Sequence, residues 1–181
     1  MNASSEAGVS HSRRWWWWLA LSVVVVTADQ LSKHVVLAML RPGDERIVTS
    51  FLSIVLAFNA GAAFSFLGDA TGWQRYLFGG FAVTASALIV WLLRRGGNVV
   101  YCAALSLILG GALGNLWDRA TLGKVVDFVL VHDFLPRGLP GAVWFDPFPA
   151  FNVADSAITI GAVLLIIDSF RQRPAPTAKP Q

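Results

Sequence analysis

Charged residues are scarce in this sequence, and their scarcity is the first constraint on its class. They make up 14% of the chain, whereas hydrophobic residues make up 55%. A soluble domain carries about 25% charged residues. The apolar residues form long blocks, the mean hydropathy is +0.58 and the pI is near 9.5. These values indicate a membrane protein with basic flanks, and nothing in them is typical of a nucleic-acid-binding protein.

Several catalytic motifs are also missing. The single cysteine, Cys102, excludes an internal disulfide framework and a multi-cysteine metal site. No HExxH motif and no glycine-rich phosphate loop occur, and the histidines His11, His34 and His132 are scattered. Ser156 would need His132 as its base, and no motif supports that pair. Carboxylates remain as the candidate catalytic groups, and neither a metal nor another cofactor is predicted.

Four apolar blocks account for most of the chain. A spanning helix needs about 20 apolar residues, and the blocks lie at about 15–40, 73–93, 99–116 and 153–167. The predicted fold is an all-α membrane protein with four transmembrane helices. One domain covers residues 15–170, between disordered tails at 1–14 and 171–181.

The first block has an alternative interpretation. Its basic flank and the run WWWW at 15–18 are typical of an interfacial anchor. A cleavable signal peptide is the alternative, because VTA at 26–28 resembles a cleavage site. Four bulky tryptophans fit a short signal core poorly, and the apolar pattern resumes after the polar residues 29–33. A retained spanning helix is therefore favoured.

The distribution of basic residues predicts the orientation. Two long connections, at about 41–72 and 117–152, hold five basic residues, whereas the tails and the short 94–98 turn hold Arg13, Arg14, Arg94, Arg95, Arg171, Arg173 and Lys179. By the positive-inside rule both termini face the cytoplasm. The long connections and the start of the fourth helix are then expected at the outer face.

The two outer connections differ in composition. Residues 46–67 are rich in Ile, Val and Phe, which predicts short strands or an interfacial hairpin as a small extracytoplasmic β element. The second connection contains four prolines between 136 and 149. A short interfacial helix near 120–135 is predicted there.

Polar residues inside apolar blocks are functional candidates, because charges in hydrocarbon are costly. Asp29 and Lys33 are four residues apart, so they share a helix face and can pair. Such a pair would lock the first helix to its neighbours. Gly110 and Gly114 form a small-xxx-small face suited to close helix packing.

The end of the third block, GGALGNLWDR at 110–119, is more ambiguous. Asn115, Asp118 and Arg119 either terminate the helix or form a polar shell that positions another group. Asn59 interrupts an apolar run, either as part of a turn or as a donor and acceptor for a peptide backbone.

Two aspartates near the outer face raise the question of paired catalysis. Asn152 and Asp155 match a capping box at the start of the fourth helix. Asp127, in KVVDFVLV, is either a solvated loop carboxylate or a catalytic acid. Two close carboxylates share a proton and can activate water against a peptide bond. The outer side offers Asp118, Asp127, Asp133, Asp146 and Asp155. Asp168 would lie about 20 Å from Asp155 along the helix, so it is excluded as its partner.

Five blocks, in order, resemble the lipoprotein signal peptidases (signal peptidase II) of bacteria. The blocks are DQLSK at 29–33, NAGAAFSFL at 59–67, GGALGNLWDR at 110–119, VVDF at 125–128 and FNVADSAITIG at 151–161. With the four apolar segments they cover nearly the whole chain except the tails.

The resemblance implies an aspartyl endopeptidase of the bacterial cytoplasmic membrane that cuts prolipoproteins just before their diacylglyceryl-modified cysteine. It implies Asp127 and Asp155 as the catalytic pair. It also implies supporting roles for Asp29, Lys33, Asn59, Gly111, Asn115, Asp118, Arg119 and Asn152. The expected partners are the lipid-modified substrate and the bilayer, with no metal and no nucleic acid.

Two other functions are compatible with the same residues. A small proton-coupled transporter or channel would use Asp29, Asp118, Asp127 and Asp155 as relay carboxylates, and polar residues would line a path through the whole bilayer. A non-catalytic membrane scaffold would keep its function when Asp127 and Asp155 are neutralised.

Overall fold

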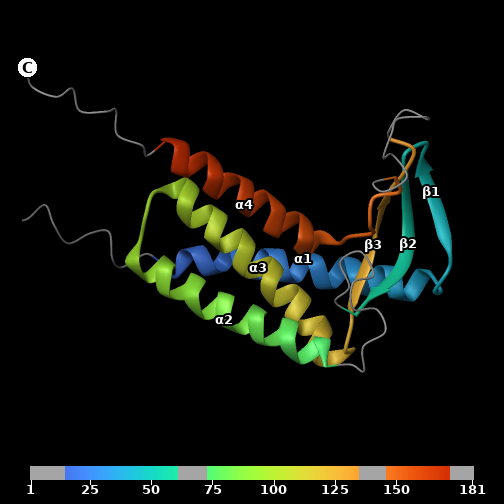
Figure 1. Cartoon of the computed structure of the whole chain (residues 1–181), viewed down its shortest axis with the longest axis horizontal. Helices are drawn as coiled ribbons and strands as arrows, with labels where there is room; N and C mark the ends of the chain where they lie inside the picture. Colours follow the sequence, from blue (N-terminus) through green and yellow to red (C-terminus); the bar gives the residue numbers. More distant parts are fainter. Residues whose placement is uncertain (1–14, 61–72, 135–145, 172–181) are drawn as a thin grey trace, which may run out of the picture.

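The structure is a computed structural model that describes residues 15–60, 73–134 and 146–171. In these residues the elements are α1 (Trp17–Met39), β1 (Glu45–Thr49), β2 (Leu52–Asn59), α2 (Gln74–Arg95), α3 (Val99–Thr121), β3 (Val125–Val131) and α4 (Val153–Arg171) (Figure 1). All four helices are long and apolar enough to cross a membrane. The predicted four-helix fold is confirmed. The predictions of disorder at 1–14 and 172–181 fall outside the described residues, whereas Arg171, predicted to lie in the tail, is the last residue of α4.

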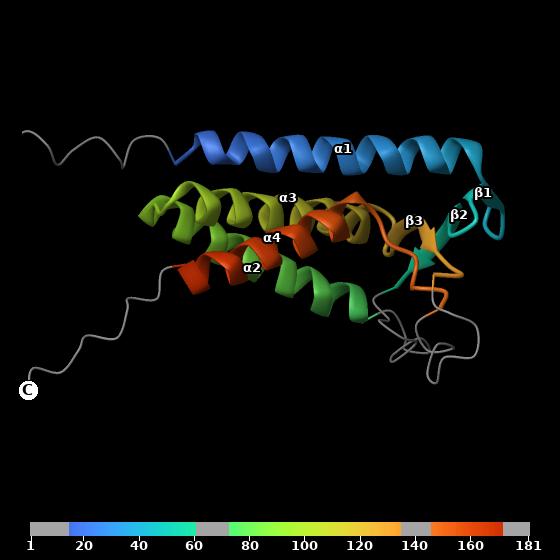
Figure 2. The ribbon, with the colours of Figure 1, turned by 90° about the horizontal axis from the view of Figure 1, so that it is seen from above.

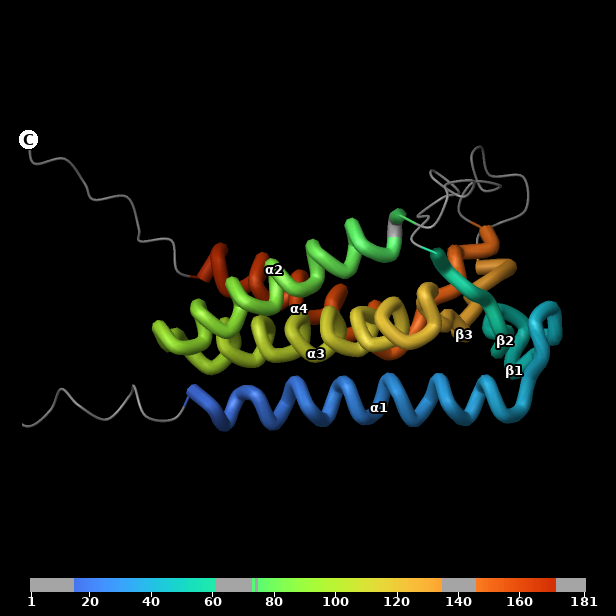
Figure 3. The backbone as a smooth tube through the Cα atoms, turned by 90° about the horizontal axis from the view of Figure 1, so that it is seen from below, coloured from blue at the N-terminus to red at the C-terminus, as the bar shows by residue number. Residues whose placement is uncertain are grey.

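The helices lie side by side along the long axis of the molecule, and the strands cross one end of the bundle (Figure 1). α3 is the central helix, because α1, α2 and α4 all pack against it, and the view in Figure 3 places it between α1 and α2. The start of α1 and the end of α4 lie at the end of the bundle remote from the sheet (Figure 2). The molecule therefore has a sheet end and an opposite, helix-only end.

Glycines allow the close approach of α3 to its neighbours. A Cβ on Gly110 would lie 2.8 Å from the Ser22 carbonyl oxygen of α1, and one on Gly114 would lie 2.7 Å from Oδ2 of Asp29. The predicted small-xxx-small face is thus confirmed as the α1 contact. On the adjacent face, a Cβ on Gly111 would collide with the backbone of Ala154 in α4. These contacts set how close the polar residues of the three helices can come.

The strands form an antiparallel sheet in the order β1-β2-β3. β1 and β2 confirm the predicted hairpin over its described part, and residues 61–67 of that segment lie outside the description. The predicted interfacial helix near 120–135 is wrong, because α3 continues to Thr121 and Val125–Val131 is a strand. Four of its seven residues are valines, and β2 offers an open edge with which they pair.

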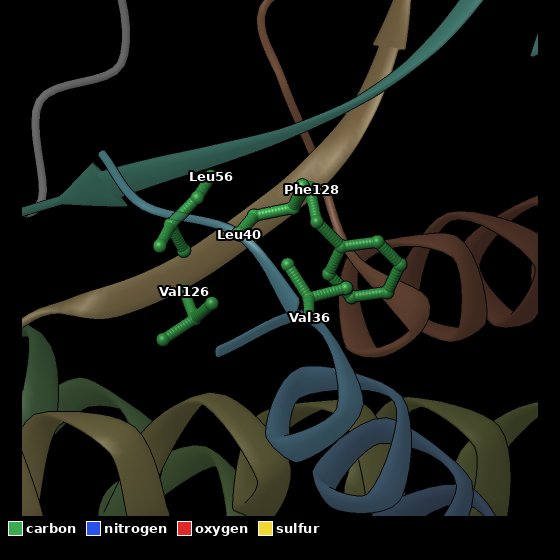
Figure 4. Packing of buried hydrophobic residues seen from close by; sticks show 5 residues of the cluster. All are labelled: Val36, Leu40, Leu56, Val126 and Phe128. Carbon is green, nitrogen blue, oxygen red and sulfur yellow. The ribbon is translucent and has the colours of Figure 1, made fainter. Parts of the chain in front are cut away.

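A small apolar core attaches the sheet to the helices. Val36 and Leu40 at the end of α1 pack with Leu56 of β2 and with Val126 and Phe128 of β3 (Figure 4). Val126 and Phe128 point to this core, and Asp127 between them points to the other side because successive strand residues alternate. The core therefore fixes the direction of the Asp127 side chain.

Candidate active site

Asp127 and Asp155 come together from different elements at the sheet end. Asp127 lies in β3, opposite Ala57 of β2, and is 3% exposed. Asp155 is in the first turn of α4 and is half-buried. Phe151, just before α4, pairs with Val129 of β3 and so holds the start of α4 against the strand. The Asp127 and Asp155 pairing predicted from sequence is therefore geometrically available.

Asn152 connects the two carboxylates. Its Nδ2 donates to Oδ1 of Asp127 at 2.7 Å. Its Oδ1 accepts from the Asp155 amide at 2.9 Å, and its own amide donates to Oδ2 of Asp155 at 3.2 Å. The last two bonds form the predicted reciprocal capping box. Asn152 thus caps α4 and positions the Asp127 carboxylate at the same time.

Asn115 provides a second connection, from α3. Its Nδ2 donates to Oδ1 of Asp155 at 2.8 Å, and its Oδ1 accepts from Asn152 at 3.1 Å. The same oxygen accepts from Nζ of Lys33 at 3.1 Å. Asn115 lies within α3, which continues beyond it, so its side chain does not terminate the helix. Its hydrogen bonds fix the position of Asp155 relative to the rest of the site.

The surroundings of Asp127 favour its protonated form. Burial, and secondly the charge of Asp155, raise the pKa of Asp127 from 3.8 to about 7. Hydrogen bonds from Asn59 and Asn152 and the charge of Lys33 act in the opposite direction. Near neutral pH Asp127 therefore holds a proton in about half of the molecules, so the protonated acid that catalysis by a carboxylate pair requires is present.

Arg119 brings a positive charge to the pair. Its charge interacts with those of Asp155, Asp127 and Asp118, and its guanidinium lies 5.5 Å from the centre of the Phe78 ring. One Nη donates to the Asn115 carbonyl oxygen at 3.2 Å. Its Nε is buried and has no hydrogen-bond partner within the described residues. The guanidinium thus adds a positive charge beside the two carboxylates.

A buried ionic cluster lies beside this site. Nζ of Lys33 is 2.8 Å from Oδ2 of Asp29 and 2.8 Å from Oδ2 of Asp118. Oδ1 of Asp29 accepts from the Ala154 amide in the first turn of α4 at 2.9 Å. The predicted Asp29–Lys33 pair is confirmed, and it joins α1 to α3 and α4. A carboxylate at this helix N-terminus is also favoured by the helix dipole.

Asp118 and Gln30 extend the cluster to the strand. Oδ2 of Asp118 accepts from the amide of Val126, the residue before Asp127, at 3.1 Å. Gln30, which sequence reasoning missed, donates to Oδ1 of Asp118 at 2.9 Å and to the Gly114 carbonyl oxygen at 3.2 Å. Its polar side chain next to Asp29 in an apolar block was the available signal. The cluster thus positions the backbone of the catalytic candidate Asp127.

The alternative arrangements are not assembled among the described residues. The hydroxyl of Ser156 donates to the Asn152 carbonyl oxygen at 3.0 Å, whereas His132 is bonded to Ser53 at 2.9 Å. Asp168 accepts from Asn98 at 2.7 Å at the helix-only end, in agreement with its exclusion as a partner of Asp155.

In the part of the chain that the structure describes, buried polar residues do not form a path through the bundle. Between the sheet-end cluster and Asp168, the buried polar side chains within the described residues are Ser22 and Ser106. Each hydroxyl is bonded to a backbone carbonyl, Ser22 to that of Ser106 and Ser106 to that of Cys102, both at 2.8 Å. A proton-relay path predicted for a transporter would need ionisable groups in this interval.

Four membrane-spanning helices that bring two carboxylates, linked through Asn152, to one end are the arrangement expected of a membrane aspartyl peptidase. The model of the family described as signal peptidase (SPase) II matches residues 21–171, so the chain belongs to this family. The match begins within α1, at residue 21, and includes Asp29 and Lys33, which supports a retained first helix.

Relatives and solved structures agree with this assignment. A lipoprotein signal peptidase of Ralstonia nicotianae is 52% identical over 94% of this chain and 92% of its own. One of Pseudomonas aeruginosa is 51% identical over 84% of this chain and 87% of its own. A bacterial membrane enzyme solved at 2.3 Å resolution has a TM-score of 0.73 and 30% identity, covering 91% of this chain and 94% of that one. The chain is thus a protease of a bacterial membrane, and the transporter alternative is not supported.

Proposed function

We propose that this protein removes signal peptides from diacylglyceryl-modified prolipoproteins by cutting just before the lipidated cysteine, with Asp127 and Asp155 as the catalytic pair. The observation that carries the proposal is the linkage of these carboxylates through Asn152 and Asn115. Family membership supports the substrate class. The position of the pair, where four apolar helices meet the sheet, suits a peptide whose lipid stays in the bilayer.

In the proposed mechanism Asp127 is the acid, because its pKa is raised to about 7, and Asp155 is the base. Asp155 accepts a proton from a water molecule held between the carboxylates, and the water oxygen attacks the scissile carbonyl carbon. Asp127 donates its proton to the carbonyl oxygen. When the tetrahedral intermediate collapses, Asp155 gives its proton to the leaving amine, Asp127 recovers a proton from a hydroxyl of the intermediate, and both peptide products depart. The step uses neither a metal nor a covalent enzyme intermediate.

Some of the supporting residues contact the carboxylates or can reach the substrate, and others hold the helices and the strand in position. Asn115 and Asn152 orient the carboxylates through the bonds described above. Asn59, hydrogen-bonded to Asp127, lies where it can also hold substrate backbone, and the charge of Arg119 acts on both carboxylates. Gly111 and the cluster of Asp29, Lys33 and Asp118 act on the positions of the elements that carry the pair, not on the substrate.

The proposed orientation places both termini in the cytoplasm and the catalytic pair at the outer face. The concentration of basic residues at the helix-only end supports it, because Arg94, Arg95 and Arg171 lie at the ends of α2 and α4 there. Water would reach the pair from outside, and the lipid chains would enter sideways from the bilayer. The peptidase domain would span residues 15–170, between cytoplasmic tails.

A gel-shift assay on a lipidated prolipoprotein in detergent tests the proposal. Asp127→Asn and Asp155→Asn should each abolish processing, and the proteins should still purify as folded monodisperse species. Asp44→Asn is the matched control, because Asp44 is exposed and accepts from the Arg41 amide, which an asparagine oxygen can also do. Near-normal cleavage by either variant at the catalytic positions would refute the pair.

A further inference from the structure

A cavity lies at the helix-only end, on the opposite side of the bilayer from the proposed catalytic pair. Its volume is about 900 Å³, and it is bounded by the end of α2, the turn that joins α2 to α3, the start of α3 and the end of α4. Arg95, Asn98 and Asp168 line it, together with the apolar side chains of Leu92 and Leu165. Neither the peptidase mechanism nor the buried cluster at the sheet end uses any of these residues.

The cavity presents charges of opposite sign. Asp168 is only 5% exposed, and its Oδ1 accepts a hydrogen bond from Nδ2 of Asn98 at 2.7 Å. Arg95 is exposed, and its guanidinium lies 3.6 Å from the centre of the Trp91 ring. The aromatic contact limits the positions that the arginine can adopt, and the asparagine does the same for the carboxylate. Both charges are therefore held in place at the rim of the membrane.

These features match the headgroup of one kind of lipid. Arginine binds phosphate with several donors at once, and a nearly buried carboxylate is an acceptor for an ammonium N–H. Leu92 and Leu165 continue the cavity wall with apolar surface, along which acyl chains can follow the helices into the bilayer. We propose that this cavity binds a phospholipid with a primary ammonium headgroup, its phosphate at Arg95 and its ammonium at Asp168.

Other lipid headgroups fit less well. An anionic headgroup without a cation could place its phosphate at Arg95, but it would bring no ammonium N–H to Asp168. A quaternary ammonium has no N–H to donate, and it is typically bound by a cage of aromatic rings. Among the described lining residues the only aromatic ring is that of Tyr101. The ammonium N–H is therefore the group that this site selects.

Native mass spectrometry of the full chain, with lipids titrated in detergent, measures the selectivity directly. Phosphatidylethanolamine should bind about tenfold more tightly than phosphatidylcholine of the same acyl chains, the value of one charge-assisted hydrogen bond. Phosphatidylglycerol should bind more weakly than phosphatidylethanolamine. Equal affinities for the first two lipids would overturn the proposal without any variant. Soluble phosphoethanolamine alone should raise the melting temperature less than phosphatidylethanolamine does. An equal rise would show that the acyl chains have no part in binding, and it would overturn a lipid as the ligand.

Three variants assign the roles. Asp168→Asn keeps an acceptor for Asn98 and should remove the preference for ethanolamine over choline, whereas Arg95→Gln should weaken binding of all three phospholipids. Arg94→Gln is the control: Arg94 lines a different groove, between α1, α2 and α3, and lies over Trp15. It should retain the tenfold preference. If Asp168→Asn lowers the melting temperature but keeps the preference, Asp168 is only structural and the proposal fails.

Discussion

Nδ2 of Asn152 lies 2.7 Å from Oδ1 of Asp127 and donates a hydrogen bond to it. The same side chain caps α4 through the amide of Asp155. A strand carboxylate and a helix carboxylate are thereby positioned by one residue, so the start of α4 cannot shift without moving the pair. This double role can be separated by substitution.

Asn152→Ser should retain most of the stability and lose most of the activity. Serine caps a helix about as well as asparagine does, but it is too short to reach Asp127. We expect about 100-fold slower cleavage, the effect of small misplacements in an active site, with a melting temperature close to that of the wild type. Asn152→Ala is the comparison and should lose about 1 kcal/mol of stability as well. Full activity in Asn152→Ser would show that the bond to Asp127 has no catalytic role.

Lys33→Met should destabilise the folded protein strongly. The methionine fills a similar volume but leaves Asp29 and Asp118 buried without their cation. Breaking a buried ion pair in this way costs about 3–5 kcal/mol. Thermal unfolding in detergent provides the measurement. Adding Asp29→Asn to Lys33→Met removes one uncompensated charge and should recover part of the loss; no recovery would contradict the electrostatic explanation.

Gly111→Ala should separate α3 from α4. The added methyl group would meet the backbone of Ala154 and lie 2.7 Å from Cγ1 of Ile158. Overpacking of this kind costs about 1–3 kcal/mol of stability. Activity should also fall, because Asn115 would move away from Asp155. Gly80→Ala is the matched control in α2, since its Cβ would meet nothing within 4 Å. That variant should be neutral or more stable by up to about 1 kcal/mol.

Stability and activity should both fall as the pH rises toward 8. The pKa of Asp127 is about 7 in the folded protein, above its ordinary value of 3.8. Between these values the folded state holds a proton that the unfolded chain releases. The contribution of Asp127 is therefore greatest below about pH 4 and is lost as the pH passes 7, by up to about 4 kcal/mol. Processing should decline above pH 7, because the proposed acid loses its proton.

Melting temperatures across pH 5–8, with parallel cleavage rates, check this expectation. Asp127→Asn should remove most of the pH dependence of stability. Asp155→Asn should move the remaining transition to lower pH, because the charge of Asp155 raises the pKa of Asp127. If the melting temperature of Asp127→Asn depended on pH as steeply as that of the wild type, the titrating group would be a different residue.

The features that follow from local spacing were predictable from the sequence. Apolar runs of sufficient length predict spanning helices wherever they occur. The Asp29–Lys33 pair and the Asn152–Asp155 cap depend on helical geometry over three or four residues, and both are present. Glycines four apart likewise predict a close helix contact without information about the partner.

The features that depend on distant partners were not predictable in this way. Residues 125–131 form a strand only because β2 lies alongside, and Gln30 joins the cluster only because α3 brings Asp118 next to it. The bond from Asn115 to Asp155 spans 40 residues. Spacing along the chain carries no information about such distances.

The sequence alone therefore determined a four-helix membrane protein with polar residues at one end, because hydrophobic length and helical periodicity are local properties. The resemblance of its separated blocks to a known family indicated which carboxylates to pair. Only the tertiary structure brought Asp127 of the strand to Asp155 of the helix. Sheet pairing, glycine-mediated helix contacts and the buried ionic cluster act together there to hold in one place groups that are 28 residues apart.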